Sequence, residues 1–233
     1  MICICIPSRG RPGFITRTVE KILKNADNRE NVIVKYYINN DDPDIQSYET
    51  FLKEMQNKYG SSVQYIIGPD QSPVYSWNLI AESTEADFYM LAGDEVQFKT
   101  KGWDSIILRT KDKHPDGIFV VAAYDDRGSH THDRCTQPFV TKEWAKALGY
   151  HWNPAFIHWN IDEYTGELCK AIDRFIYLQD VVIKCVKIKD PTGARLRTPG
   201  LFNRDKWMFD KLMQNNLESD ITKLRKAISE AKA

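Results

Sequence analysis

The chain has few of the features that mark membrane, secreted and nucleic-acid-coating proteins. Lys and Arg together number 32, as do Asp and Glu, and this balance argues against a protein that coats nucleic acid through a general basic surface. No apolar run approaches the length of a transmembrane span. The five cysteines are odd in number and show no CxxC spacing, which argues against a disulfide framework and favours a reducing compartment.

The N-terminus also lacks a targeting pattern. The chain starts directly with "MICICIPS", without a basic region followed by a long apolar region. We therefore expect a cytoplasmic protein. The 233 residues, 42% hydrophobic and 27% charged, are typical of a globular chain that buries a substantial core. No internal repeat or domain boundary is visible, so we predict a single domain, residues 1–233.

The first half alternates short apolar runs with amphipathic segments. Strands are predicted at 2–6, 32–39, 63–68 and 87–92, and helices at 14–25, 44–59 and 74–84. This alternation predicts an α/β fold with a mainly parallel sheet flanked by helices. In such sheets, ligands bind outside the carboxyl ends of the strands. Polar loops follow all four predicted strands, at 7–12, 39–44, 68–73 and 93–95.

Charged residues in these loops are candidates for contacts with a nucleotide. Arg9 and Arg11 flank Gly10 and suit a phosphate or a nucleobase, although a solvated loop is the better explanation when this segment is taken alone. Asp41 and Asp42 suit hydrogen bonds from a base or a ribose, but acids are also common at a helix N-terminus.

The strongest candidates for metal ligands follow the fourth predicted strand. Asp94 and Glu95 offer the carboxylate oxygens that Mg²⁺ and Mn²⁺ prefer, and such an ion would bridge phosphates. An ordinary acidic turn is the alternative. The four polar loops together indicate a ligand site more strongly than any one of them does alone.

The second half is less regular. A strand is predicted at 117–126, a polar loop at 127–134, and the end of a strand followed by a helix at 139–148. A further helix is predicted at 160–172, one or two strands at 175–188, and a mobile loop at 189–206, where Pro and Gly recur. An apolar stripe indicates a final helix packed on the body of the protein; its residues are Leu217, Ile221, Leu224 and Ile228.

Three segments of the first half are distinctive together: "ICIPSRGRP", "YYINNDDPD" and "GPDQSPVYSWNLIAESTEADFYMLAGDEVQF". Through them the first half resembles a GT-A glycosyltransferase of the family 2 type, in particular small bacterial and phage enzymes. That family has a Pro-Ser/Thr-x-x-Arg loop after the first strand, an acidic loop after the second, a helix carrying Asn, and an Asp-x-Asp motif. The resemblance implies a nucleotide-sugar half (1–110), an acceptor and catalytic half (111–206) and a helical extension (207–233).

The resemblance also implies site residues. It assigns the nucleotide-sugar pocket to Pro7, Ser8, Arg9, Arg11, Asp41, Asp42, Asn78, Gly93 and Asp94. Asp94 takes the second acidic position of Asp-x-Asp and contacts a divalent metal, with Glu95 as a second ligand. Ala92 stands at the first acidic position. Cys185 and Lys187 lie where many relatives place a metal-binding His.

Inverting members of the family use an Asp or Glu near the start of a helix as the general base. Asp162 and Glu163 fit this position, and we favour Asp162, although both acids also suit a helix N-terminus. Trp152 and Trp159 lie close by in sequence, and one of them is a candidate for stacking on an acceptor ring.

The segment 184–206 is basic. It contains seven basic residues but only two acidic ones, Asp190 and Asp205. The basic residues are Lys184, Lys187, Lys189, Arg195, Arg197, Arg204 and Lys206. A mobile loop with Lys187, Arg195 and Arg197 would close over a diphosphate. The same residues would suit a nucleic-acid backbone or a solvated loop.

These observations predict an inverting glycosyltransferase that uses a nucleotide-diphosphate sugar, with UDP-sugars favoured, and Mn²⁺ or Mg²⁺. The acceptor hydroxyl is open, and a hydroxymethylated DNA base is one candidate suggested by the resemblance to phage enzymes. The protein would act in the cytoplasm of a bacterium or of a phage-infected host cell. The alternatives are a catalytically inactive module that binds sugar nucleotides or glycans, and a nucleotidyltransferase, for which "PSRGRP" is poor in glycine.

Overall fold

The computed structural model describes residues 1–125, 135–186 and 191–231. The polar loop predicted at 127–134, as well as Lys187, Lys189 and Asp190, lies outside these residues. None of the helices in the described ranges is long and apolar enough to cross a membrane. All five cysteines are buried and free, so the prediction of a chain without a disulfide framework is confirmed.

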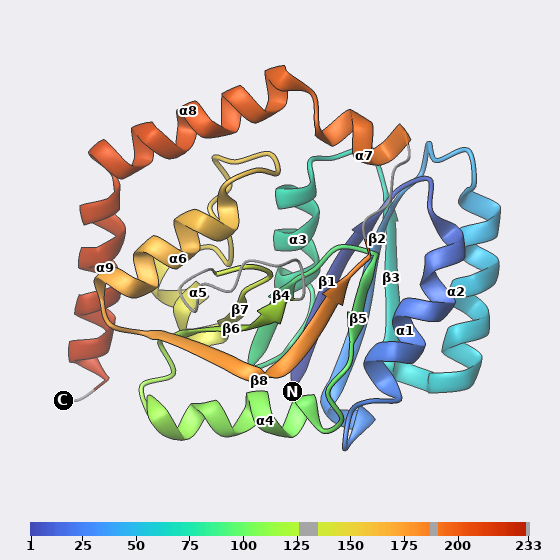
Figure 1. Cartoon of the computed structure of the whole chain (residues 1–233), viewed down its shortest axis with the longest axis horizontal. Helices are drawn as coiled ribbons and strands as arrows, with labels where there is room; N and C mark the ends of the chain where they lie inside the picture. Colours follow the sequence, from blue (N-terminus) through green and yellow to red (C-terminus); the bar gives the residue numbers. More distant parts are fainter. Residues whose placement is uncertain (126–134, 187–190, 232–233) are drawn as a thin grey trace.

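One sheet runs through the described part of the chain (Figure 1). Its strand order is β3-β2-β1-β4-β7-β6-β8-β5. The strands are β1 Ile2–Ser8, β2 Val32–Asn39, β3 Val63–Gly68, β4 Phe88–Leu91, β5 Val96–Phe98, β6 Val120–Asp125, β7 Phe139–Thr141 and β8 Phe175–Cys185. Strands β3, β2, β1 and β4 are parallel, as is the pair β6 and β8. Strand β7 is antiparallel to both β4 and β6, and β5 is antiparallel to β8. The α/β prediction is confirmed, with a mixed sheet whose first half is parallel.

Helices cover both faces of this sheet (Figure 1). They are α1 Ile15–Leu23, α2 Ile45–Tyr59, α3 Pro73–Glu82, α4 Trp103–Arg109, α5 Lys142–Leu148, α6 Ile161–Ala171, α7 Pro191–Leu196, α8 Pro199–Asn215 and α9 Leu217–Glu230. Short 3-10 helices occur at Pro12–Phe14, Arg29–Asn31, Gly60–Ser62 and Thr110–Lys113.

The opening "ICICI" explains why both faces of the sheet are covered. Side chains alternate between the faces of a strand, so Ile2, Ile4 and Ile6 join the hydrophobic core beneath α1, α2 and α4. Cys3 and Cys5 join the second core, to which α3, α5, α6 and α9 contribute. All five side chains are fully buried, and each buried isoleucine contributes about 2 kcal/mol through the hydrophobic effect. A fully apolar strand therefore fixes β1 in the centre of the sheet.

The prediction of a loop at 189–206 is wrong for the described residues 191–206. They form α7 and the first part of α8. The position 206/207, which was predicted to divide the acceptor half from the helical extension, lies inside α8. The physical reason is that Pro191 and Pro199 stand at the starts of these helices, where proline costs no hydrogen bond. The final helix is confirmed as α9, with Ile221, Leu224 and Ile228 buried.

Candidate functional site

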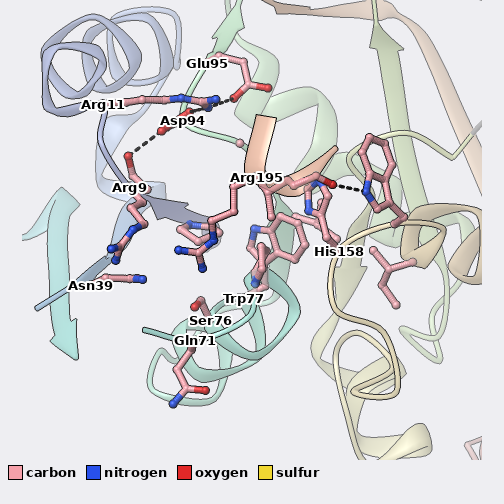
Figure 2. A pocket seen from close by; sticks show the side chains of 18 of the residues that line it. Arg9, Arg11, Asn39, Gln71, Ser76, Trp77, Asp94, Glu95, His158 and Arg195 are labelled. Atoms are coloured by element: carbon pink, nitrogen blue, oxygen red, sulfur yellow. Dashed lines mark hydrogen bonds and ion pairs between the residues drawn. The ribbon is translucent and has the colours of Figure 1, made fainter. Parts of the chain in front are cut away.

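A cavity of about 290 Å³ opens at the carboxyl ends of the parallel strands. Residues from both halves of the chain line it (Figure 2). The predicted site residues among them are Pro7, Ser8, Arg9, Arg11, Gly93, Asp94, Glu95, Asp162, Arg195 and Arg197. The polar strand ends therefore converge, as the parallel arrangement of β1, β2, β3 and β4 predicted.

Asp94 is a buried acid of the cavity that is held by two residues of the first half of the chain. Its carboxylate is buried, with 4% exposure, and it accepts hydrogen bonds from Ser8 Oγ at 2.6 Å and from Arg11 Nη1 at 2.8 Å. The Ser8 hydroxyl also lies 2.7 Å from the Tyr48 hydroxyl. Ser8 at the end of β1 and Arg11 in the following loop thus hold the acid after β4, because β1 and β4 are neighbours in the sheet.

Glu95 lies beside this buried pair. Burial and, after it, the neighbouring Asp94 carboxylate together raise the pKa of Glu95 to about 7. Arg11 Nη1 is 3.9 Å from Glu95 Oε2 and opposes the shift. A Cβ atom at Gly93 would lie 2.5 Å from Glu95 Oε2, so glycine at this position leaves room for the carboxylate. Asp94 and Glu95 form a tight acidic pair that favours a nearby cation.

Ala92 shows why the acidic pattern is incomplete. Its side chain is fully buried in the core beneath α1 and α2. Its N–H donates to the carbonyl of Cys5 at 3.1 Å, and its carbonyl accepts from Trp77 Nε1 at 3.0 Å. An acid at position 92 would be buried in an apolar environment, at a high cost in free energy.

The acidic pair has the chemistry of a divalent-metal site that relies on the substrate. Mg²⁺ is commonly held by one or two carboxylates, with phosphates and water completing its shell. Asp94 and Glu95 supply such carboxylates, and within the described residues no group of three or more His, Cys, Asp or Glu side chains suits a metal. Arg11 already neutralises part of the charge of the pair. The residues fit a metal that is bound together with a diphosphate.

Asp70 connects three parts of the cavity, and the sequence analysis did not single it out. It follows β3, accepts a hydrogen bond from Asn39 Nδ2 at the end of β2, and lies 3.9 Å from Arg9 Nη1. Its oxygens also accept from Arg195 Nη2 at 2.9 and 3.0 Å. Arg195 therefore connects α7 to the loop after β3. In the view of Figure 2 it lies between Arg9 and Trp77. An acid directly after a predicted parallel strand was the available signal.

Three of the residues predicted for the nucleotide-sugar pocket lie outside the cavity lining. Asp41 is exposed and pairs with Arg9, while Asp42 is buried and accepts from the N–H groups of Gly10 and Asp44 at 2.7 and 2.8 Å. Both acids therefore shape the loops, and Asn39 lines the cavity instead.

Asn78 is the third predicted residue outside the lining, and its role is structural. Its Oδ1 accepts from the N–H groups of His151 and Trp152 at 3.2 and 3.1 Å. Its Nδ2 donates to the carbonyl groups of Val74 and Trp152 at 3.1 and 2.7 Å. The amide is saturated by the backbone, so the prediction that it lies near a donor finds no support in its position.

The second half supplies another wall of the cavity, formed by residues 158–162. Asp162 lines the cavity from the first turn of α6. Glu163 is exposed, lies outside the lining, and accepts from Asn160 Nδ2 at 2.6 Å. The structure therefore separates the two candidate bases and leaves Asp162 in place.

The two tryptophans near this wall have different positions. Trp152 is fully buried and cannot reach a ligand. Trp159 lines the cavity, and its Nε1 donates to the carbonyl of Leu196 at 2.6 Å. Of the two candidates for stacking, only Trp159 is accessible from the cavity.

His158 also lines the cavity, although no sequence pattern pointed to it. Its ring stacks on Trp77, with centroids 6.0 Å apart and planes at 21°. Burial lowers the pKa of His158 to about 4, so the ring is neutral at pH 7. A neutral, stacked imidazole suits shaping of the wall more than binding of a phosphate.

The basic segment 184–206 does not form an open cationic loop where it is described. Arg195 pairs with Asp70, and Lys206 pairs with Asp210. Arg204 Nη1 donates to Asp205 at 2.6 Å and to the carbonyl of Ala155 at 2.7 Å. These three cations are paired within the protein, and Arg195 and Arg197 line the cavity.

Comparison with known proteins points to one fold. No protein-family model matches the chain, and no curated protein matches it. Among solved structures, S. aureus TarS 1-349 in complex with UDP-GlcNAc has a TM-score of 0.72 at 10% identity, covering 97% of this chain and 71% of that one. The mannosyltransferase PcManGT from Pyrobaculum calidifontis, in complex with GDP-Man and Mn²⁺, has a TM-score of 0.66 at 9% identity, covering 99% and 74%.

The extent of the match varies among the TarS structures. A further structure of TarS 1-349 has a TM-score of 0.62 at 11% identity, and the match spans 79% of this chain but only 60% of that one. In TarS itself the match spans 36% of the length. Within these limits, the likeness shows that this chain has the fold of glycosyltransferases whose structures hold nucleotide sugars.

Proposed function

We propose that the protein is an inverting glycosyltransferase, which moves a sugar from a nucleotide-diphosphate sugar to a hydroxyl group of an acceptor. One observation carries this proposal. A single cavity combines the Arg11–Asp94–Glu95 edge from the first half of the chain with the carboxylate of Asp162 from the second half. The fold shared with proteins bound to UDP-GlcNAc and GDP-Man supports the choice of donor.

The donor would lie along the strand ends. Its diphosphate carries negative charge, and the guanidinium groups of Arg9, Arg11, Arg195 and Arg197 line the cavity. We favour a UDP-sugar because, of the two complexes described above, the one with the higher TM-score holds UDP-GlcNAc. Asp94 and Glu95 would hold Mn²⁺ or Mg²⁺, which when bound neutralises the charge of the diphosphate.

Asp162 would act as the general base. Its carboxylate takes the proton of the acceptor hydroxyl while that oxygen attacks C1 of the sugar on the face opposite the diphosphate. The new C1–O bond forms as the bond from C1 to the diphosphate oxygen breaks, and the electron pair leaves with the nucleoside diphosphate. The arginines stabilise the charge that develops on this leaving group. Attack from the opposite face inverts the configuration at C1.

Trp159 would bound the acceptor side, because its ring lies in the same wall as Asp162. An aromatic face stacks on a sugar ring or on a base. Nucleic-acid binding depends on cations that contact phosphates, and Arg204 and Lys206, which lie outside the cavity lining, pair with Asp205 and Asp210. We therefore favour a saccharide acceptor, with a hydroxymethylated DNA base as the alternative.

A binding module without catalysis is the second candidate function. The observation in its favour is Ala92, which leaves the acidic pattern one carboxylate short. Such a module would keep the donor contacts and lose turnover.

Calorimetry combined with a turnover assay separates the two functions. UDP-glucose, UDP-GlcNAc and GDP-mannose would be titrated with and without Mn²⁺. Release of nucleoside diphosphate would then be measured with saccharides and with hydroxymethylated DNA. We expect binding of one donor and turnover with one acceptor class. Binding without turnover would favour the module, and no binding would contradict both functions.

A further inference from the structure

Asp205 is an unusual residue of α8. Most of this helix is exposed, and only Asp205 and Leu212 are buried in it. The Asp205 side chain has no exposure at all. A buried carboxylate is costly unless hydrogen bonds compensate its lost hydration. Its partners therefore indicate what it does.

The partners of Asp205 are three consecutive backbone N–H groups and one guanidinium. Its carboxylate accepts from Ile157 at 3.1 and 3.3 Å, and from His158 and Trp159 at 2.8 Å each. Arg204 Nη1 adds a fourth donor at 2.6 Å. Only a group with two acceptor oxygens can serve all of these donors.

The segment held by Asp205 leads directly to the proposed base. Asn160 follows with a positive φ of 62°, and α6 begins at Ile161. Asn160 makes no side-chain capping hydrogen bond to α6, so the usual local cap does not fix the start of this helix. The backbone at 157–159 before the helix is held by Asp205. The N–H of Val74 also donates a hydrogen bond to the carbonyl of Ile157 at 3.2 Å.

We propose that Asp205 is a positioning residue, which holds the backbone at 157–159 so that the first turn of α6 presents Asp162 to the cavity. This inference rests on the proposed function, because it takes Asp162 to be the base. Asp205 itself touches no reacting atom. Its loss would displace the base and leave the donor edge at Arg11 and Asp94 intact.

The test compares Asp205→Asn with a matched variant, Asp104→Asn. Asp104 on α4 is also fully buried and accepts two backbone N–H groups, from Asp27 at 2.7 Å and Asn28 at 3.1 Å. None of these three residues lines the cavity. Both substitutions keep the size of the side chain and replace an acceptor oxygen by a donor, so a loss of general stability affects both.

The measurements are amide hydrogen exchange, donor affinity by calorimetry, and steady-state kinetics below the unfolding temperature. For Asp205→Asn we expect faster exchange at 157–159 and a kcat lowered between about tenfold and about 100-fold, as small misplacements of catalytic groups cause. Donor affinity should change by less than about twofold, within the scatter of distant substitutions. Asp104→Asn should keep the wild-type kcat and the wild-type exchange at 157–159.

Several results would overturn the inference. Unchanged exchange at 157–159 in Asp205→Asn would show that the carboxylate does not hold the segment. A wild-type kcat in that variant, or an equal loss of kcat in Asp104→Asn, would refute the positioning role. If Asp205→Asn does not fold, Arg204→Gln replaces it, and a smaller loss of kcat is expected because the three backbone bonds remain. Absence of turnover in the wild-type protein would instead refute the proposed function, while the exchange experiment would still test the contact.

Discussion

The two halves of the chain build their walls of the cavity in different ways. In the first half, Ser8, Asn39, Asp70 and Asp94 each lie at or within three residues of the end of a parallel strand. In the second half, the wall at 158–162 runs into the first turn of α6. Its backbone at 157–159 is held by Asp205 on α8, 46 to 48 residues further along the chain. The first wall follows from sheet geometry, and the second depends on a tertiary contact.

This difference predicts a division of labour. The strand-end wall carries Arg9, Arg11 and the acidic pair, which suit a diphosphate. The wall held by Asp205 carries the carboxylate that suits proton transfer. Substitutions in the first wall should therefore change donor binding, and those in the second should change turnover.

Asp162→Asn gives the largest expected effect. Removal of a general base costs about 10²- to 10⁴-fold in rate, so kcat should fall in this range while calorimetric donor affinity stays the same. Glu163→Gln is the matched control, because Glu163 is adjacent but exposed and outside the cavity lining. An equal loss of kcat in both variants, or a loss of donor affinity in Asp162→Asn, would break the division between the walls.

Asp94→Asn should mainly affect the donor. The substitution weakens the bonds from Ser8 and Arg11 and removes one charge of the acidic pair. Changes to the groups around a metal typically cost about 10- to 100-fold in metal affinity, so donor affinity in Mn²⁺ should fall by about 10- to 100-fold.

Asp41→Asn is the matched control for this measurement. Asp41 pairs with Arg9 at the surface and lies outside the cavity lining. Exposed ion pairs contribute little, so calorimetric affinity should stay within about threefold of the wild-type value. Equal losses in the two variants would show that the cavity is not the donor site.

The smallest expected effect is a pH dependence of the free energy of unfolding, which arises from histidines in the second half. All five histidines follow residue 113, and burial lowers the pKa of His151 and His158 to about 4. In the unfolded chain their pKa is about 6.5, so the unfolded state binds more protons between pH 6.5 and 4. The contribution of these two histidines to the free energy of unfolding is therefore highest above pH 6.5 and decreases as the pH falls toward 4.

His151→Phe tests this dependence outside the cavity. Phenylalanine retains an aromatic contact with Tyr89, whose ring centroid lies 4.4 Å from that of His151, and it cannot be protonated. Urea unfolding at pH 7.5 and pH 5 should show a loss of stability that is smaller than in the wild type by about 1–2 kcal/mol. Equal losses in the two proteins would place the acid sensitivity elsewhere.

The strand-end wall could be predicted to a large extent. The strands at 32–39 and 63–68 were predicted with the bounds of β2 and β3, because apolar runs with polar ends are local signals. Arg11, Asp94 and Glu95 followed from the rule that the carboxyl ends of parallel strands meet at one edge. Asp70 was not predicted, because an acid in a loop can have many roles. Its contacts with Arg9 and Arg195 identify it as part of the cavity wall.

The wall of the second half could be predicted only in part. Asp162 was chosen from its place at a helix start, but nothing local separated it from Glu163. Pro191 and Pro199 were interpreted as signs of a loop, since proline at a helix start and proline in a loop look alike in sequence. Asp205 was counted as one acid of a basic segment.

The sequence by itself determined the α/β class, the central strand "ICICI", and the polar strand ends. Each of these is a periodic or local pattern of burial, which the chain encodes within a few residues. The tertiary structure decided which acids line the cavity, that the cations Arg195, Arg204 and Lys206 pair within the protein, and that Asp205 holds the backbone before α6. These features depend on which distant groups come within hydrogen-bonding distance, and that is settled only when the helices pack on the sheet.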